Sequence, residues 1–93
     1  MAGTMRVEAG VASLEGDLTL ANASQWLAEG ETALSQGAQA FDLAGVTHLD
    51  SSALSLLFSF RRRAMAAGQT LEFRNLPASI TSLAKLYGVS DQI

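Results

Sequence analysis

Apolar and polar positions change their period several times along this chain of 93 residues, and each change predicts a new element. Residues 5–9 and 11–15 alternate between apolar and polar side chains, which is typical of strands with one buried face. Gly10 separates these two runs, and Gly16 with Asp17 forms a turn signal after the second one. We therefore predict an antiparallel pair of strands at the start of the chain.

Two longer stretches carry apolar side chains at helical spacing. In residues 21–36, leucines and Trp26 recur on one side while glutamine and glutamate fill the other, as in an amphipathic helix. Residues 52–67 form a second apolar stretch of similar length. Gly37 and Gly68 follow these two stretches, and glycine commonly ends a helix because it tolerates a left-handed backbone.

The segments after the two long helices predict further strands. Residues 38–43 and 69–74 have the apolar content and alternation of strands, and residues 45–49 would connect the first of them to the second helix. Pro77 suits the first turn of a third helix, which would end at Gly88.

The predicted order is therefore β-β-α-β-α-β-α. Strands joined through helices lie parallel with right-handed crossovers, whereas the first two strands are antiparallel, so the sheet should be mixed. We expect one α/β domain over residues 1–93, with about four strands in a small sheet and the helices packed mainly on one face.

Composition excludes several classes of protein. The net charge is −3, which disfavours a role in binding nucleic acid, because such proteins usually carry a basic surface. There is no cysteine, so disulfides and thiolate metal sites are ruled out. No apolar run approaches the ~20 residues that a membrane-spanning helix needs, and no basic start precedes an apolar run. We expect a cytoplasmic domain without a membrane span.

The predicted second helix is apolar over a wide arc. Leu54, Phe58 and Met65 lie beside the face that would pack on the sheet, so the arc spans about 200°. Two interpretations remain open at this point. The first helix could cover the additional apolar side chains, or they could form an exposed strip for a partner, including a second copy of the chain.

Asp50, Ser51 and Ser52 stand at the start of the second helix, where aspartate and serine commonly cap backbone N–H groups. The two serines could serve only as caps. They could also present a docking or regulatory hydroxyl at the positive end of the helix, where phosphorylation would add about −1.5 to −2 charges. Asp17 and Asp42, if they lie at the same edge of the sheet, would add repulsion.

Catalytic signatures are missing from the chain. There is no phosphate-binding Gly-x-x-x-x-Gly-Lys-Ser/Thr loop and no Gly-x-Ser-x-Gly nucleophile turn. His48 is the single histidine, and a set of Ser51, His48 and Asp42 lacks any mark of an oxyanion site. Asp42 and Asp50 could be considered as a metal pair, but a strand end and a helix cap explain them better. We expect no enzyme, no metal and no cofactor.

The stretch Phe41-Asp-Leu-Ala-Gly-Val-Thr-His-Leu-Asp-Ser-Ser-Ala-Leu-Ser-Leu-Leu57 resembles the core signature of STAS domains, the family named after sulphate transporters and anti-sigma factor antagonists. Leu14-Glu-Gly-Asp-Leu18 is similar to the turn that follows the second strand in that family. The resemblance extends from about Val7 to Val89. It implies a small α/β interaction domain.

Two branches of the family match different features. Anti-sigma factor antagonists usually carry Asp-Ser-Ser/Thr-Gly-Leu-Gly and are phosphorylated on the serine after the aspartate, which would be Ser51. Here Ala53 and Ser55 replace the two glycines. The small STAS subunit of Mla-type phospholipid ABC transporters carries a C-terminal Leu-Ala-Lys-Leu-Tyr, which appears here as Leu83 to Tyr87. We favour this second branch.

The favoured branch implies a non-catalytic cytoplasmic subunit that binds the ATPase of an inner-membrane transporter and helps to maintain outer-membrane lipid asymmetry. The alternative branch implies an anti-sigma factor antagonist that is switched by phosphorylation. The residues that the resemblance places in the contact are Asp50, Ser51, Ser52, Ala53, Leu54, Ser55 and Phe58. Gly16, Asp17 and Asp42 would support the contact from neighbouring strand ends.

Overall fold

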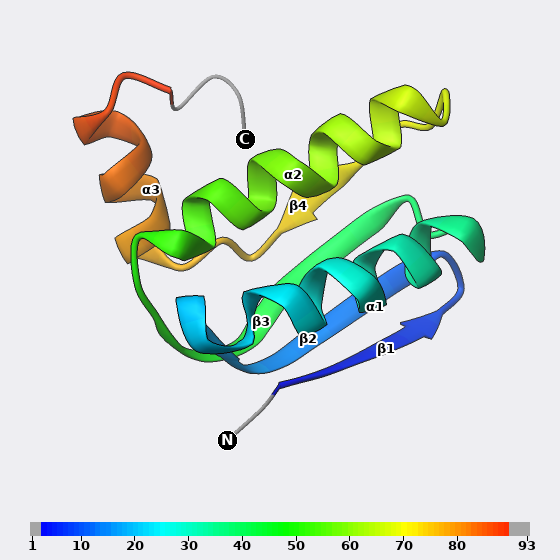
Figure 1. Cartoon of the computed structure of the whole chain (residues 1–93), viewed down its shortest axis with the longest axis horizontal. Helices are drawn as coiled ribbons and strands as arrows, with labels where there is room; N and C mark the ends of the chain where they lie inside the picture. Colours follow the sequence, from blue (N-terminus) through cyan, green and yellow to red (C-terminus); the bar gives the residue numbers. More distant parts are fainter. Residues whose placement is uncertain (1–2, 90–93) are drawn as a thin grey trace.

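Four strands and three α-helices follow one another in the predicted order within residues 3–89, the part of the chain that this computed structural model describes (Figure 1). The predicted mixed α/β class is confirmed. The elements are β1 (Thr4–Glu8), β2 (Val11–Leu18), a short 3₁₀ helix η1 (Leu20–Asn22), α1 (Ala23–Ser35), β3 (Ala40–Leu49), α2 (Ser52–Ala66), β4 (Glu72–Arg74) and α3 (Ala78–Leu86).

The strands form one sheet in the order β1-β2-β3-β4. β1 pairs antiparallel with β2, as expected, whereas β3 is parallel to both of its neighbours. Ala9 and Gly10 join the first two strands, and both have positive φ angles, 52° and 81°. Two consecutive left-handed residues form the tight turn whose twist matches that of antiparallel strands. The local sequence therefore determines the hairpin at the sheet's edge.

The predicted turn at Gly16 and Asp17 is wrong, and so is the predicted connection at residues 45–49. Both segments are strand: β2 continues to Leu18 and β3 continues to Leu49. The cause is their mutual pairing, in which Gly16 lies opposite Val46. Gly16 has a φ of 108°, and the register shifts beside it, so a bulge accommodates the turn-like residues inside the strand.

The predicted strand 69–74 shrinks to Glu72–Arg74. The end of α2 accounts for the difference, because the Gln69 N–H donates to the carbonyl of Ala64 at 2.8 Å while Gly68 has a φ of 70°. This is the glycine-terminated helix end that the sequence predicted at Gly68, and it extends one residue into the expected strand. The glycines after α1 and α3 also have left-handed φ angles, as predicted.

α1 and α2 run side by side over one face of the sheet, and α3 stands at the end where α2 begins (Figure 1). The core lies between the two long helices and the sheet, and it contains Trp26, Phe41, Phe60 and Leu57. α1 and α3 both pack against α2, and Leu54 of α2 is 5% exposed. Leu54 is therefore buried within the domain, but its side of α2 is the one on which Arg61 bonds to the Leu71 carbonyl, away from α1, and Met65 on that side stays exposed.

Phe60 stands where the two helices and the sheet meet. Its ring meets that of Phe41 edge to face, with 4.9 Å between the ring centroids. On its other side it lies against Gly30 of α1, where an added Cβ would come within 2.2 Å of the Phe60 ring. The absence of a side chain at Gly30 is therefore what allows α1 to approach α2 at this point.

We predict that Gly30→Ala destabilises the domain. Alanine is favoured over glycine inside a helix by up to about 1 kcal/mol. Forcing a methyl group against the buried Phe60 ring should instead cost about 1–3 kcal/mol, so the net effect should be a loss of stability. Urea denaturation of the variant and the parent protein measures this difference.

The control is the same change made in a Phe60→Leu background, where the smaller side chain leaves room for the methyl group. There Gly30→Ala should be close to neutral or stabilising. Equal losses of stability in both backgrounds would contradict the steric explanation.

Candidate functional site

The carboxylate of Asp50 organises the start of α2. Its Oδ1 accepts the backbone N–H of Ser52 at 2.9 Å, and its Oδ2 accepts the backbone N–H of Leu20 at 3.2 Å. Asp50 is exposed, and its pKa lies below the usual value because the Leu20 N–H, above all, stabilises the charged form, with smaller help from Ser52. A single side chain thus joins the beginnings of η1 and α2.

Ser51 occupies the N-cap position of α2 but does not act as a cap. Its backbone is already helical, with φ −62° and ψ −19°, and its side chain makes no capping hydrogen bond. Of the two alternatives left open for the serines, capping does not hold for Ser51, because Asp50, expected as a helix cap, accepts the Ser52 N–H from one position earlier. Ser52 is half-buried and its backbone N–H bonds to Asp50, whereas Ser51 is exposed.

The predicted contact residues divide into two groups along α2. Ala53 is fully buried and Leu54 is 5% exposed, so both belong to the core and are not accessible to a partner. Ser55 is exposed and Phe58 is half-buried. Ser51, Ser55 and Phe58 are four and three residues apart, a spacing that places them on one side of a helix. The accessible surface is therefore the outer side of the first two turns.

The backbone of Asp17, near the end of β2, anchors the segment that leads into α1. The carbonyl oxygen of Asp17 accepts two hydrogen bonds of 2.7 Å, one from Nε1 of the buried Trp26 and one from Nδ2 of Asn22. These bonds fix η1 and the first turn of α1 to the end of β2. The acceptor in these two bonds was not predictable from residue types, because a backbone carbonyl has no sequence signature.

Leu20 is a residue of this surface that the sequence analysis missed. It lies just before the helix predicted at residues 21–36, where it begins η1, and its side chain is 73% exposed. Its N–H bond to Asp50 places its backbone directly beside the start of α2. Thr19 before it, closed by Asn22 in a capping box, is the local signal for a separate short turn.

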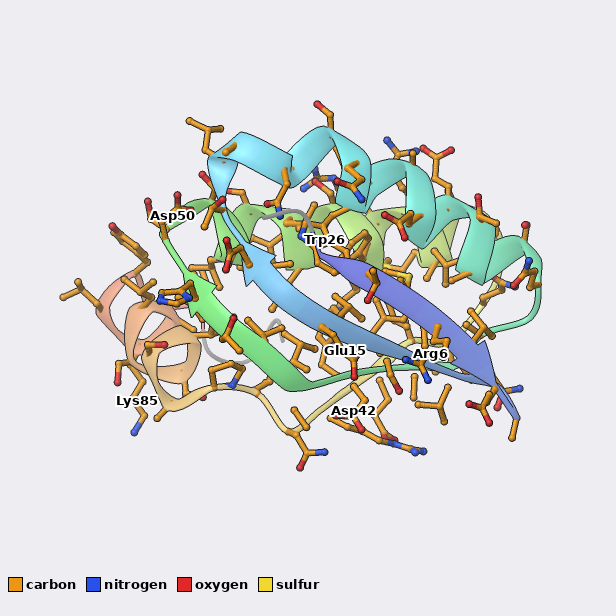
Figure 2. The ribbon with its side chains drawn as sticks, turned by 90° about the horizontal axis from the view of Figure 1, so that it is seen from below. Arg6, Glu15, Trp26, Asp42, Asp50 and Lys85 are labelled. Carbon is orange, nitrogen blue, oxygen red and sulfur yellow. The ribbon has the colours of Figure 1, made fainter. Side chains whose placement is uncertain are left out.

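Asp42 does not belong to this site. It lies near the start of β3 rather than at its carboxyl end, on the face of the sheet away from α1 and α2, whereas Asp50 follows the end of that strand (Figure 2). Seven strand residues lie between the two, and eight steps of about 3.3 Å put them about 26 Å apart. Asp42 accepts hydrogen bonds from Asn75 Nδ2 and from the Ala44 N–H, each 2.9 Å long, and these bonds lower its pKa.

The histidine is not brought to Asp42 either. Nδ1 of His48 lies 3.4 Å from Oδ1 of Asp17, its neighbour across the β2–β3 pairing, and its side chain is 81% exposed. The set of Ser51, His48 and Asp42 considered from the sequence is therefore not assembled. Within residues 3–89 no group of three or more histidine, cysteine and acidic side chains is placed to hold a metal ion.

Two further features concern the rest of the domain. Among the residues that the structure describes, no helix has both the length and the apolar character needed to cross a membrane. A hollow of about 550 Å³ lies at the opposite end of the helices, lined by residues of the Gly37 and Gly68 turns. The candidate site, by contrast, consists of exposed side chains along the first turns of α2.

We predict that Asp50→Asn lowers stability at neutral pH and that this deficit disappears in acid. The pKa of Asp50 is depressed in the folded state, so its contribution is present above the unfolded value of about 4 and is lost as the pH falls through the folded value. Urea midpoints of both proteins from about pH 7 down to about pH 2.5 measure this gap in stability between the variant and the parent protein. A gap that stays constant across this range would contradict the role given to the carboxylate.

Comparison with solved structures finds the same fold in other proteins. The anti-sigma factor antagonist SpoIIAA in its unphosphorylated form matches with a TM-score of 0.65 and 19% identity, over 89% of this chain and 81% of that one. The phosphorylated form of SpoIIAA, described as a Bacillus cell fate determinant, matches with a TM-score of 0.67 and 19% identity, over 96% of this chain and 86% of that one. At this identity the likeness concerns the fold.

A third similar structure, titled a crystal structure analysis of Mglu, has a TM-score of 0.56 and 24% identity, and the match covers 80% of this chain but 19% of that one. Curated protein sequences give no significant match. The family model described as the MlaB STAS domain matches residues 1–93, the whole length of the chain. With the strand order and the Asp-Ser-Ser start of α2 already established, the chain belongs to the MlaB-type STAS domain family.

Proposed function

We propose that this domain is a non-catalytic subunit that binds the ATPase of an Mla-type phospholipid ABC transporter through the start of α2. The observation that carries the proposal is the exposed hydroxyl of Ser51, which is released from capping because Asp50 takes that role. STAS domains are generally regulatory and interaction domains. A polar group that does no structural work at the end of a helix is suited to recognition by another protein.

The shape of the surface supports a macromolecular partner. Ser51 and Ser55 are exposed, and Phe58 next to them is half-buried, so two hydroxyls and an aromatic edge lie along one side of α2. Leu20 adds an exposed apolar side chain beside Asp50. Aromatic and apolar groups mixed with hydrogen-bonding side chains are typical of protein interfaces.

Charge indicates the chemistry of the partner. Asp50 presents an exposed carboxylate beside the Ser51 hydroxyl, and the side chain of Asp17 is 31% exposed at the end of the neighbouring strand. The Asp50 carboxylate already occupies the positive end of α2, which removes the advantage that a second anion would find there. The partner surface should therefore offer cationic or N–H donor groups.

The membership in the MlaB-type family supports the identity of that partner. In this proposal ATP hydrolysis belongs to the transporter's ATPase, and the STAS domain contributes to its assembly or activity. The domain would lie at the cytoplasmic side of the inner membrane, held there by its partner, and would act in phospholipid transport that maintains outer-membrane asymmetry.

We predict that Ser51→Arg weakens the complex with the ATPase by about tenfold or more, because a long cationic side chain would meet the donor groups of the partner at the centre of the contact. The measurement is co-purification from native membranes, with mass spectrometry to identify and quantify the ATPase. The parent protein should recover the ATPase, and its addition should raise ATP hydrolysis or the stability of the complex.

The matched control is Ser35→Arg, which makes the same change at an exposed serine at the opposite end of the two long helices. It should leave recovery within about twofold of the parent, as surface changes outside an interface usually do. Circular dichroism and urea midpoints confirm that both variants are folded. Failure of the parent protein to recover any ABC-transporter ATPase would refute the proposal, and equal recovery by both variants would remove Ser51 from the contact.

An alternative function rests on the same hydroxyl. SpoIIAA, which shares the fold, is an anti-sigma factor antagonist with a phosphorylated form. An exposed serine one residue after Asp50 is accessible to a kinase, and a phosphate there would stand beside an existing carboxylate. Added negative charge at that point would change the contact with a partner and would act as a switch.

For this alternative we expect incubation with serine kinases from the same cells and ATP to place phosphate on Ser51. Phosphopeptide mapping identifies the site, and Ser51→Ala should abolish the signal while Ser35→Ala leaves it unchanged. Phosphate found on Ser52 alone, or on no serine, would exclude the phosphorylation switch and leave the transporter subunit as the remaining function.

A further inference from the structure

Within the part of the chain that the structure describes, β1 forms an open edge of the sheet, with β2 as its single neighbour in the strand order. In an antiparallel pair, alternate residues exchange hydrogen bonds with the neighbouring strand, and the residues between them direct their N–H and C=O groups outward. Counting from the tight turn at Ala9 and Gly10, the outward-directed residues are Met5 and Val7. Both therefore offer a donor and an acceptor to another strand.

β1 lacks two of the devices that protect an edge strand, a bulge and a proline, although it carries the charged side chains Arg6 and Glu8. It pairs with β2 over five residues without a register shift, and it contains no proline. The opposite edge, β4, is protected by its length of three residues. A regular edge of five residues is long enough to pair with a strand from another molecule.

A groove accompanies this edge. A hollow of about 280 Å³ lies between β1 and α1, lined by Met5, Arg6, Val7, Glu29, Thr32, Ala33 and Gln36. Met5 and Val7 are half-buried there and pack against the core from its margin. A strand added to β1 would place its own core-facing side chain above this groove and would complete the burial of Val7.

The charges of β1 are complementary to those of a second β1 strand. Arg6 and Glu8 are exposed and stand two residues apart on the face of the sheet away from the helices, where Figure 2 shows Arg6 beside Glu15. If two copies pair antiparallel with Val7 opposite Val7, each Arg6 faces the Glu8 of the other copy. A register shifted by one residue on each strand, with Arg6 opposite Arg6, brings like charges together and is disfavoured.

We propose that the β1 edge is a self-association surface, on which a second copy of this chain pairs antiparallel through Val7 and extends the sheet across both molecules. Arg6 then stands between Glu15 of its own chain, 3.6 Å away, and Glu8 of the second copy. The contact is small, so the dimer should be weak and should depend on concentration. It leaves Ser51 accessible and does not depend on the function proposed above.

The test is sedimentation equilibrium of the full chain from about 10 μM to about 1 mM, the range in which small interfaces associate. The parent protein should approach a dimer at the upper end. Arg6→Glu and Glu8→Arg should each weaken the dimer by about tenfold to thirtyfold, because symmetry turns two attractive pairs into two repulsive ones. The double variant Arg6→Glu with Glu8→Arg restores opposite charges and should recover the dimer.

The matched control is Arg74→Glu on β4, which changes the net charge by the same amount at the other edge of the sheet and should leave the dimer unchanged. Amide hydrogen exchange supplies a second measurement, since the N–H groups of Met5 and Val7 should be protected at high concentration and exposed at low concentration. A parent protein that stays monomeric throughout the range overturns the proposal. So does an unrestored dimer in the folded double variant, or equal weakening by Arg74→Glu.

Discussion

The contact of Phe60 with Gly30 on one side and with Phe41 on the other holds the two long helices and the sheet together. One ring connects α2 to α1, where any side chain would collide with it, and to β3, where it meets a second aromatic ring at 4.9 Å. In a domain of this size one buried aromatic cluster is a large part of the core. The spacing of the two long helices follows from that single residue without a side chain.

That spacing also determines what reaches the surface. Since α2 lies against both α1 and the sheet, its inner side chains, Ala53 and Leu54 included, are buried, and the side with Ser51 and Ser55 faces outward. The first turn is fixed from outside the helix by Asp50, and the start of α1 is fixed by the bond from Trp26 to the Asp17 carbonyl. The candidate site therefore consists of exposed side chains on a rigid support.

Periodicity predicted the order of the elements, the antiparallel hairpin and the glycine-terminated helices, because these features depend on local residue types. It failed where pairing between distant segments decides the structure. Gly16 and residues 45–49 look like turns by composition, yet they pair with each other and become strand. The same error put Asp42 at the end of a strand that continues seven residues further, to Leu49.

At the site itself, the sequence identified the Asp-Ser-Ser segment but not the division of labour within it. Ser51 is free of capping only because a carboxylate one residue earlier takes the N–H of Ser52, which is a matter of backbone angles. That carboxylate also holds the N–H of Leu20, so the segment before α1 and the first turn of α2 share one acceptor. A partner that moved the Asp50 carboxylate would therefore alter both hydrogen bonds, which connects the start of α2 to the segment before α1.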